Sequence, residues 1–293
     1  MSEPTFCAGM ADFASRYRGF IIDQWGVLHD GQAPYRGALA CLERLRDEGG
    51  RIVLLSNSGK RVADNRARLR AMGFGDTLFD AVVTSGEAAW RSLRDREEPF
   101  YRALGTRCLL WVQAGDASFV DGLGVTLVEQ VEDADFILVA GVDLGGQVID
   151  FEPALQQALA RDLPMVCANP DVVVVTPDGL HMAPGAIAGH YASLGGRVAY
   201  AGKPYAPIYR LCLEALAPLS ATQILAIGDS LEHDVAGAAS IGMDAALVMG
   251  GIHADAFDLE HGRIANLPAL ERLVQAHGAT PRWVLPRFRW RTA

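Results

Sequence analysis

Two short apolar runs, about two hundred residues apart, each lead into an aspartate, and this pairing constrains the fold more than any other feature of the chain. Phe20–Ile22 leads to Asp23, and Ile224–Ile227 leads through a glycine to Asp229. Short continuous apolar runs are typical of strands that are buried on both faces of a parallel sheet. Open α/β sheets place their ligand sites at the carboxyl ends of such strands. The sequence therefore predicts two distant segments side by side in one sheet, with their carboxylates at the same edge.

The other segments alternate between strand-like and helix-like patterns. An amphipathic helix is expected from about Arg36 to Asp47, and Gly49 and Gly50 after it are a helix-stop signal. Regular alternation of this kind indicates a parallel sheet with helices on both faces. We therefore predict an α/β fold with a Rossmann-like, doubly wound parallel sheet as its core. The further strand-like runs are 51–58, the start of 81–89, 197–203, 223–229 and 245–251, and the further helices are 61–72, 206–217 and 234–241.

The middle of the chain has an alternation of its own and is long enough for a second, smaller α/β domain. Because Asp23 and Asp229 must meet in one site, the simplest organisation inserts this segment into the first domain. We predict a core of residues 1–97 and 186–293 and an inserted cap domain at 98–185, which would be well placed to act as a lid. Its strand-like runs begin at Cys108, Ala134, Met165 and Val172, and its helix is expected near Pro153–Arg161.

Composition excludes several classes of protein. The chain has 293 residues, of which 50% are hydrophobic and 21% charged, as in a globular protein. A net charge of −9 argues against nucleic acid as a partner, and no apolar run approaches the roughly 18 residues that a membrane span needs. No signal-peptide pattern is visible at the N-terminus. Five scattered cysteines are expected to be reduced core thiols in a cytoplasmic protein: Cys7, Cys41, Cys108, Cys167 and Cys212.

The acidic residues near the two strand ends predict a metal site. Asp23, Asp229 and the nearby Asp234 offer carboxylate oxygens, the ligands that a hard divalent cation such as Mg²⁺ prefers. Of 26 basic residues only Lys60 and Lys203 are lysines, and a compact ammonium suits a place beside a phosphate that arginine does not. Together these residues indicate metal-assisted phosphoryl chemistry.

Four segments in order, FIID, LLSNS, YAGKPY and ILAIGDSLEHD, resemble the motifs of the haloacid dehalogenase superfamily of aspartate-nucleophile phosphohydrolases. With GVLHDG, CANPD, PGAIAGHYASLGG and the inserted α/β domain, the chain is similar to the NagD-like branch, subfamily IIA, over nearly its whole length. The resemblance implies that Asp23 is the nucleophile and forms an aspartyl-phosphate. It also implies that Ser56 and Asn57 bind phosphoryl oxygens and that Lys203 neutralises the nucleophile–phosphate pair. Lys60 matches no catalytic position.

The resemblance further implies a Mg²⁺ site and a substrate loop. The metal would be held by Asp23, Asp229 and the backbone carbonyl of Trp25, with Asp234 binding directly or orienting a metal-bound water. Asn169 and Asp171, in CANPDVVVV, resemble the cap loop that faces the substrate in NagD-like enzymes. A plain Asn-Pro-Asp turn is the alternative there.

The chain departs from the family pattern at Trp25. The family has a second aspartate at this position, which protonates the leaving group and then activates water; an indole cannot do so. The loss of general acid–base assistance is worth roughly 10² to 10⁴ in rate. Either turnover is slow, or substrates with good leaving groups are used, or another residue supplies the proton. The candidates for that residue are His29, Asp30, Glu232 and His233.

These observations predict a Mg²⁺-dependent phosphatase, a phosphoric monoester hydrolase, that acts on a small phosphorylated metabolite such as a sugar phosphate, a nucleotide or an acyl phosphate. The alternative is a phosphate-binding or regulatory protein that has lost most of its turnover. Residues 281–293 are rich in arginine and tryptophan. They are expected either to pack their aromatic side chains on the body of the protein or to form a partner contact, so a homodimer through the cap or this tail stays open.

Overall fold

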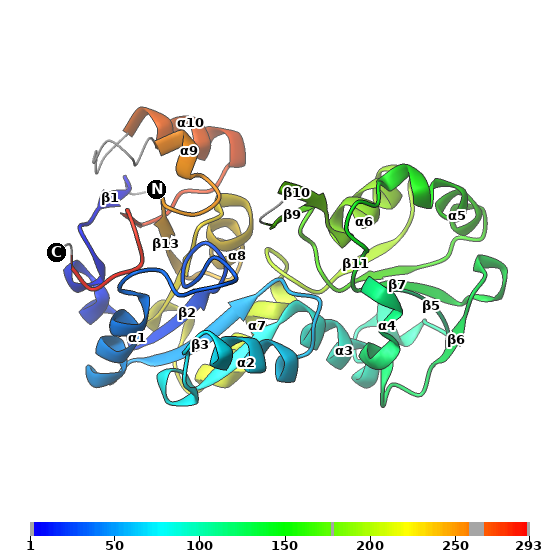
Figure 1. Ribbon diagram of the computed structural model, residues 1–293, viewed down its shortest axis with the longest axis horizontal. Coiled ribbons are helices and arrows are strands. Elements are labelled where there is room, and N and C mark those ends of the chain that lie inside the picture. The colour runs from blue at the N-terminus through cyan, green and yellow to red at the C-terminus, as the bar shows by residue number, and fades with distance from the viewer. Residues whose placement is uncertain (1–2, 177–178, 258–266, 292–293) are drawn as a thin grey trace. The chain divides into compact units, whose positions relative to one another are not determined.

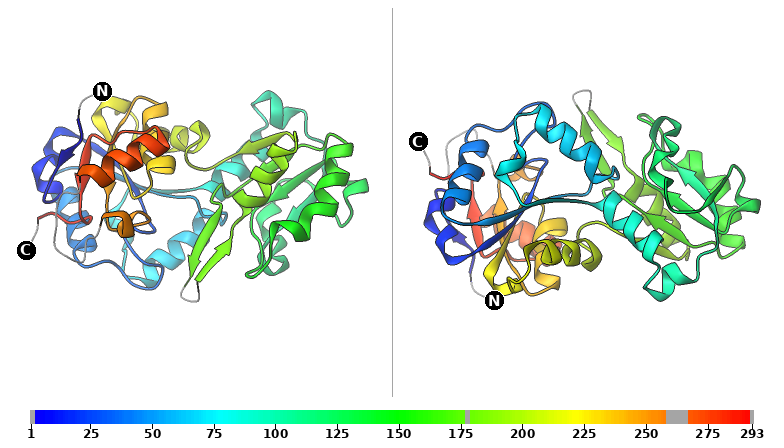
Figure 2. Two further views of the ribbon diagram at one scale, coloured as in Figure 1. Left: turned by 90° about the horizontal axis from the view of Figure 1, so that it is seen from above. Right: turned by 90° about the horizontal axis from the view of Figure 1, so that it is seen from below.

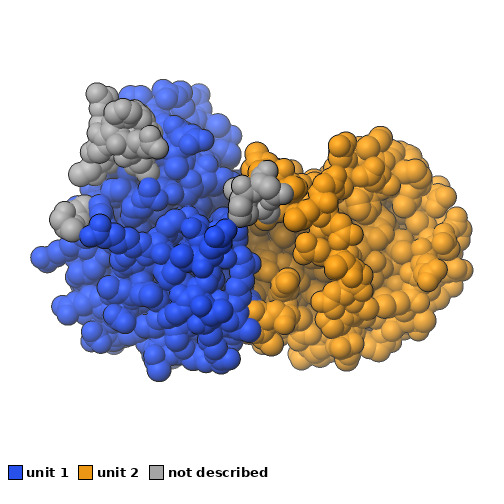
Figure 3. All heavy atoms as spheres, viewed as in Figure 1, with its two compact units in different colours: residues 1–56, 65–83, 203–293 blue, residues 57–64, 84–202 orange. Residues whose placement is uncertain are grey.

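The computed structural model describes residues 3–176, 179–257 and 267–291, and in it the chain forms two compact units. The first unit consists of residues 1–56, 65–83 and 203–293, and the second of residues 57–64 and 84–202 (Figure 3). Each unit is built on a largely parallel sheet with helices packed around it (Figures 1 and 2). The second unit is therefore an insertion that the chain enters twice.

The first unit contains a seven-stranded sheet in the order β1-β14-β13-β12-β2-β3-β4. Strands β2 and β12 are buried along their whole length because they lie inside the sheet and are covered on both faces. They pair in parallel, as their apolar sequences predict, with Ile22 opposite Ile227. The strands are β1 (Thr5–Phe6), β2 (Gly19–Asp23), β3 (Arg51–Ser56), β4 (Ala81–Thr84), β12 (Ile224–Gly228), β13 (Asp244–Val248) and β14 (Trp283–Leu285).

Helices connect these strands and cover the sheet. The expected helix at 36–47 is α1, which begins at Ala38 and ends at Asp47, before the left-handed Gly49. The helices of this unit are α1 (Ala38–Asp47), α2 (Val62–Ala71, which starts in the second unit), α7 (Ala206–Leu216), α8 (Ala236–Ser240), α9 (Ala254–Phe257), α10 (Leu267–His277), the π-helix η8 (Leu231–Val235) and the 3₁₀ turns η1 (Met10–Asp12), η2 (Ala14–Arg16), η3 (Asp76–Leu78) and η7 (Ala221–Gln223).

The second unit contains a five-stranded parallel sheet in the order β11-β8-β7-β5-β6 and a separate antiparallel hairpin, β9-β10. Its strands are β5 (Arg107–Trp111), β6 (Thr126–Val128), β7 (Phe136–Val139), β8 (Met165–Cys167), β9 (Val173–Thr176), β10 (Gly179–Met182) and β11 (Val198–Tyr200). Its helices are α3 (Ser85–Asp95), α4 (Pro99–Arg102), α5 (Val148–Ala160), α6 (Pro184–Ser193) and the 3₁₀ turns η4 (Gln113–Gly115), η5 (Ala117–Val120) and η6 (Val131–Asp133).

This unit is larger than the predicted cap of residues 98–185. Strand β11 pairs with β8, and Ile187 and Tyr191 of α6 are part of the apolar core under that sheet. Helix α3 likewise belongs to the second unit. The predicted boundaries therefore need correction to 83/84 and 202/203, because these elements complete the second sheet and its core. The strand expected in VVVVTPDG is one arm of the hairpin, and its Pro177 and Asp178 lie outside the described residues.

The C-terminal segment is part of the first unit's sheet. Strand β14 lies between β13 and β1, and the ring of Trp283 stacks on Phe13 at 4.9 Å between centroids. Trp283 and Phe288 are buried by their own chain, whereas Arg282 and Arg287 are exposed. The expectation that the tail packs its aromatic side chains on the body is confirmed for these residues; Thr292 and Ala293 lie outside the described part.

Two expectations from composition can be compared with the structure. All five cysteines are buried and carry free thiols, as expected. Among the described residues, no helix combines the length and the apolar character needed to cross a lipid bilayer.

Candidate active site

The carboxyl ends of three adjacent strands meet at one edge of the first unit's sheet. In the order β12-β2-β3, Ile227 lies opposite Ile22 and Asp23 lies opposite Leu55. Asp23 ends its strand, Ser56 is the next residue of β3, and Asp229 directly follows β12. The register alone therefore brings these three side chains to the same edge, as the sequence predicted.

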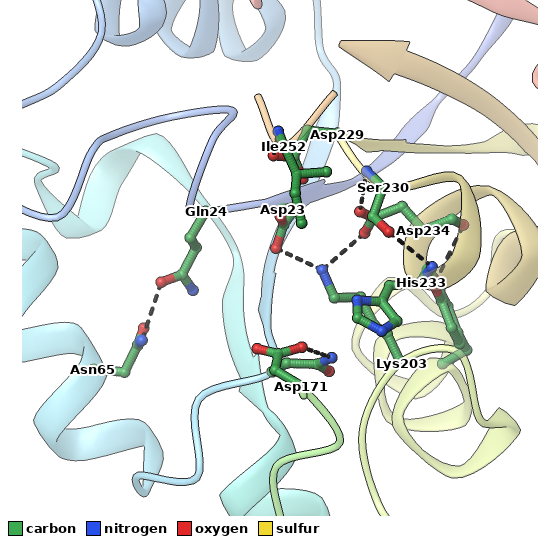
Figure 4. A network of polar contacts seen from close by, with 12 residues as sticks. Asp23, Gln24, Asn65, Asp171, Lys203, Asp229, Ser230, His233, Asp234 and Ile252 are labelled. Carbon is green, nitrogen blue, oxygen red and sulfur yellow. Dashed lines mark hydrogen bonds and ion pairs between the residues drawn. The ribbon is translucent and has the colours of Figure 1, made fainter. Parts of the chain in front are cut away.

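Three buried carboxylates form a cluster there. Asp23, Asp229 and Asp234 each contribute an oxygen, and these oxygens all lie within 4.8 Å of one another (Figure 4). The backbone N–H of Ile252 donates to Asp229 Oδ2 at 2.8 Å, and that of Ser230 donates to Asp234 Oδ2 at 3.2 Å. Backbone donors thus fix the orientation of two of the three carboxylates.

Lys203 pairs with two members of the cluster. Its Nζ lies 2.7 Å from Asp23 Oδ1 and 2.8 Å from Asp234 Oδ1, and its side chain is only 4% exposed (Figure 4). Burial lowers the pKa of Lys203, but the two carboxylates outweigh it and hold that pKa well above its usual value. The lysine is therefore a cation at any physiological pH.

The carboxylates themselves are held in an unfavourable environment for negative charge. Burial raises the pKa of Asp23 well above its usual value; Lys203 opposes this shift, while Asp234 and Asp229 add to it. Burial, with the charge of Asp234, raises the pKa of Asp229 to about 7. Buried acids that repel one another are a common mark of functional sites because a bound cation relieves the repulsion.

Glycines let the surrounding loops approach the cluster closely. A Cβ on Gly26 or on Gly251 would lie 2.0 Å from Asp229 Oδ2, and a Cβ on Gly228 would lie 1.9 Å from Asp234 Cγ. Gly26 also has a φ of +78°, in the region that favours glycine. The glycines that follow and precede the motif aspartates are thus needed for space around the carboxylates.

The donor set fits a divalent metal ion. Three carboxylates and one ammonium leave a net charge of −2 when all are ionised (three negative, one positive). Hard oxygen ligands of this kind suit Mg²⁺ or Ca²⁺. Asp23, Asp229 and Asp234 are the residues that would hold the ion.

We expect Mg²⁺ to stabilise the protein, and more strongly at pH 8 than at pH 6. The ion competes with the proton on Asp229, whose pKa is about 7 without metal, so ionisation above that pH favours binding. At about 100 times Kd the melting temperature should rise by roughly 5 °C or more. Differential scanning fluorimetry with Mg²⁺, Ca²⁺ and EDTA at both pH values measures this. Equal melting temperatures under all conditions would contradict a metal site.

The indole of Trp25 packs on the loop that follows β2 and on α2. Its ring lies edge-on to His29 with centroids 6.0 Å apart, and the guanidinium carbon of Arg68 lies 5.5 Å from its centroid. A Cβ on Gly31 would come within 2.3 Å of the ring. The side chain at the departure from the family motif is thus engaged by its own loop and by Arg68.

The two candidate proton donors in this loop have structural roles. His29 is buried, its Nδ1 accepts from the Gly31 N–H at 3.0 Å, and burial lowers its pKa to about 4. Asp30 is exposed and accepts from the N–H groups of Gln32 and Ala33, which lower its pKa. His29 is therefore neutral at pH 7, and Asp30 closes a turn.

The other two candidates lie on η8, beside Asp234. Glu232 is exposed, whereas His233 is half-buried. The His233 N–H donates to Ser230 Oγ at 3.1 Å, so its backbone is part of the cap of this turn. His233 stays the better placed of the four by its position next to a cluster residue.

A buried amide pair beside the nucleophile position was not foreseen from the sequence. Asn65 Nδ2 on α2 donates to Gln24 Oε1 at 3.0 Å, and both side chains are buried (Figure 4). The pair ties the motif loop to α2. Its only sequence signal is a polar residue on the buried face of a helix, at Asn65, and this does not identify the partner.

The remaining predicted residues belong to the second unit. Asn57 Nδ2 donates to Asp171 Oδ1 at 2.7 Å, and Asn169 Oδ1 accepts from the Asp171 N–H at 3.0 Å. The Asn-Pro-Asp segment is therefore a side-chain-capped turn, and Asp171 links it to the 57–64 segment. Lys60 is exposed, as expected for a residue without a catalytic role.

Comparison with known proteins agrees with this geometry. Residues 20–126 match the family model of haloacid dehalogenase-like hydrolases, and residues 200–277 match the HAD-hydrolase-like model. The D-glycerol 3-phosphate phosphatase of Mycobacterium tuberculosis is 31% identical over 83% of this chain, which spans 66% of that protein's length, just under two thirds. The dihydroxyacetone phosphatase of Corynebacterium glutamicum is 29% identical over 81% of this chain and 82% of its own.

A solved structure gives the same fold. A haloacid dehalogenase-like hydrolase from Brucella suis superposes with a TM-score of 0.80 at 29% identity, covering 98% of this chain and 100% of that one. A putative NagD protein superposes with a TM-score of 0.63 over 81% of this chain and 90% of its own, at 24% identity. The chain therefore belongs to the haloacid dehalogenase-like hydrolases, in their NagD-like branch, and its enzyme class is that of the phosphatases it matches.

Proposed function

We propose that this protein is a Mg²⁺-dependent phosphatase of a small phosphorylated metabolite and that it works through an aspartyl-phosphate on Asp23. The observation that carries the proposal is the buried cluster of Asp23, Asp229 and Asp234 with Lys203 bonded to two of its members. A cluster of net charge −2 has a strong electrostatic demand for a divalent cation. Relatives that are named as phosphatases of glycerol 3-phosphate and dihydroxyacetone phosphate support phosphate esters as substrates.

The proposed reaction has two steps. In the first, an Asp23 carboxylate oxygen attacks phosphorus, the new P–O bond forms, and the bond to the leaving oxygen breaks with its electron pair on that oxygen. In the second, water attacks the same phosphorus, releases inorganic phosphate and restores the carboxylate. A divalent cation bound to the three carboxylates would offset the negative charge of nucleophile and phosphoryl group.

Lys203 has a defined task in this scheme. Its ammonium, 2.7 Å from Asp23 Oδ1, is the cation nearest to the nucleophile among the described contacts. It keeps the carboxylate ionised and would compensate the phosphoryl charge that joins it. Asp234 holds the other side of the same ammonium.

Substrate recognition is proposed for residues from both units. Ser56, at the end of β3, would bind a phosphoryl oxygen beside Asp23. Asn57, Asn169 and Asp171 are proposed to contribute to the choice of substrate. Their mutual hydrogen bonds support a preformed loop, which loses little conformational freedom on binding.

Trp25 supports a second candidate, a phosphate-binding protein with little turnover. The residue cannot protonate a leaving group, so substrates with poor leaving groups should react slowly. With good leaving groups the aspartyl-phosphate should form faster than it is hydrolysed, giving an initial burst. Acetyl phosphate and p-nitrophenyl phosphate should therefore be turned over well above glycerol phosphate in the presence of Mg²⁺.

Replacing Trp25 with aspartate should raise kcat for glycerol phosphate roughly tenfold or more, because it restores an acid at the family position. Turnover of acetyl phosphate should change little, since its leaving group needs no proton. Trp25→Ala is the matched control: it also loses the packing on His29 and the interaction with Arg68 but gains no acid. Steady-state phosphate release measures all three proteins. If neither wild type nor Trp25→Asp hydrolyses any phosphate ester, the binding-protein function is preferred.

A further inference from the structure

A fully buried tyrosine lies beneath the turn that carries Asp234. Tyr209 is on the first half of α7, six residues after Lys203, and has no exposed surface. Its hydroxyl donates to the backbone carbonyl of His233 at 2.9 Å and lies 3.4 Å from that of Asp234. The phenol is thus bonded to the main chain of the cluster and not to a side chain.

The turn that it contacts is not an ordinary helical turn. Residues Leu231–Val235 form a π-helix, in which the N–H of Val235 bonds to the carbonyl of Ser230 at 3.1 Å and the N–H of Ala236 bonds to that of Leu231. A π turn is wider than an α turn, is less stable, and recurs at functional sites. It continues directly into the short helix α8. A segment of this kind keeps its shape only if its surroundings hold it.

The widened turn sets the position of the Asp234 carboxylate. That carboxylate lies against Gly228, where a Cβ would come within 1.9 Å of its Cγ, and it accepts from the Ser230 N–H. Its Oδ1 meets Lys203 Nζ at 2.8 Å. Because the space is so restricted, a small shift of the turn would move the carboxylate relative to Asp23 and Asp229.

The surroundings of Tyr209 fit a supporting role. The ring packs directly on α8, where a Cβ on Gly237 would lie 2.3 Å from the hydroxyl oxygen. Burial and the nearby Asp234 raise the pKa of the phenol well above its usual value, so the hydroxyl keeps the proton that it donates. Helix α7 therefore holds the residue Asp234 twice, through Lys203 on its carboxylate and through Tyr209 on the backbone.

We propose that Tyr209 is a positioning residue for the metal site: its hydroxyl, bonded to the carbonyl of His233, holds the π turn so that Asp234 faces Asp23 and Asp229. The inference rests on the metal site of the proposed function but does not depend on turnover. Loss of a group that orients a metal ligand from behind typically weakens metal binding 10- to 100-fold. Tyr209→Phe removes only the hydroxyl and keeps the ring in its place.

Tyr191→Phe is a matched control. Tyr191 is also fully buried, and its hydroxyl donates to a backbone carbonyl, that of Leu163, at 2.7 Å. It lies in the core of the second unit, so its loss should cost comparable folding stability without touching the cluster. A purely structural role for Tyr209 predicts that the two variants behave alike.

Isothermal titration calorimetry with Mg²⁺ alone tests the proposal. Tyr209→Phe should raise Kd about tenfold or more, and Tyr191→Phe should leave it unchanged. Hydrogen exchange adds a reading that needs no metal: the amides of Asp234 and Val235, both bonded to the Ser230 carbonyl, should exchange faster in Tyr209→Phe only.

Equal Kd values for wild type and Tyr209→Phe would overturn the proposal, as would a wild type that binds neither Mg²⁺ nor Ca²⁺. A wild type that binds Mg²⁺ but hydrolyses nothing would sink the proposed phosphatase and leave this inference standing or falling on the Kd comparison. Unchanged exchange at both amides would count against the proposal independently of metal.

Discussion

Replacing Asp23 with asparagine is expected to lower kcat for any phosphate substrate by about 10³-fold or more. The change keeps the size of a side chain that is buried beside Lys203 but removes the attacking oxygen's charge. No aspartyl-phosphate can then form, so the variant should also fail to trap fluoroberyllate. Phosphate release from acetyl phosphate, with Mg²⁺, is the measurement.

Asp30→Asn is the matched control for this change. Asp30 is an exposed aspartate seven residues further along the same loop, and its Oδ1 accepts two backbone N–H bonds that an asparagine can also accept. Its turnover should stay within a factor of two or so of wild type, since exposed substitutions of this kind have small effects. If Asp23→Asn retained wild-type turnover, the nucleophile assignment and the two-step reaction would both be wrong.

Replacing Lys203 with methionine is expected to abolish turnover and to destabilise the first unit. The substitution removes the one cation that pairs with Asp23 and Asp234 and leaves buried carboxylates uncompensated. Breaking a buried pair in this way costs about 3–5 kcal/mol. Because the pKa of Lys203 lies well above its usual value, its contribution is present across pH 6–9 and would be lost only above its unfolded-state pKa, near 10.4.

The chain supplies its own control, since Lys60 is the other lysine. Lys60→Met removes the same charge from an exposed position and should change the free energy of unfolding by less than about 0.5 kcal/mol. Urea unfolding with and without Mg²⁺ compares the two variants. Mg²⁺ should recover part of the stability lost in Lys203→Met, because a bound cation compensates the same carboxylates. Equal losses in the two variants would contradict the role assigned to the buried ammonium.

Much of the core architecture and the candidate site was predictable from local sequence. Strands β2 and β12 are continuous apolar runs, and such runs are stable only where both faces of a sheet are covered. Each run leads to an aspartate at or just after its carboxyl end, so the parallel register had to bring Asp23 and Asp229 to one edge. The positions of Ser56 and of the buried thiols follow from the same local patterns.

The limits of the second unit could not be predicted in the same way. The runs at Ser85–Asp95 and Val198–Tyr200 read correctly as helix and strand, but their patterns do not say which sheet they join. That choice depends on β11 finding β8 as its partner and on α6 filling the core beneath. Strand pairing is decided by contacts between segments about thirty residues apart, which local periodicity does not encode.

At the site, the sequence determined which groups are present, and the tertiary structure decided what each one contacts. The sequence placed Trp25 beside Asp23, but only the fold turned its indole toward His29 and Arg68. Likewise, nothing local links Tyr209 to the carbonyl of His233, 24 residues away. The physical reason is that a residue's type and spacing fix whether it is buried, whereas its hydrogen-bond partner depends on how separate helices and strands pack. Burial is a property of one segment's pattern; a contact is a property of two.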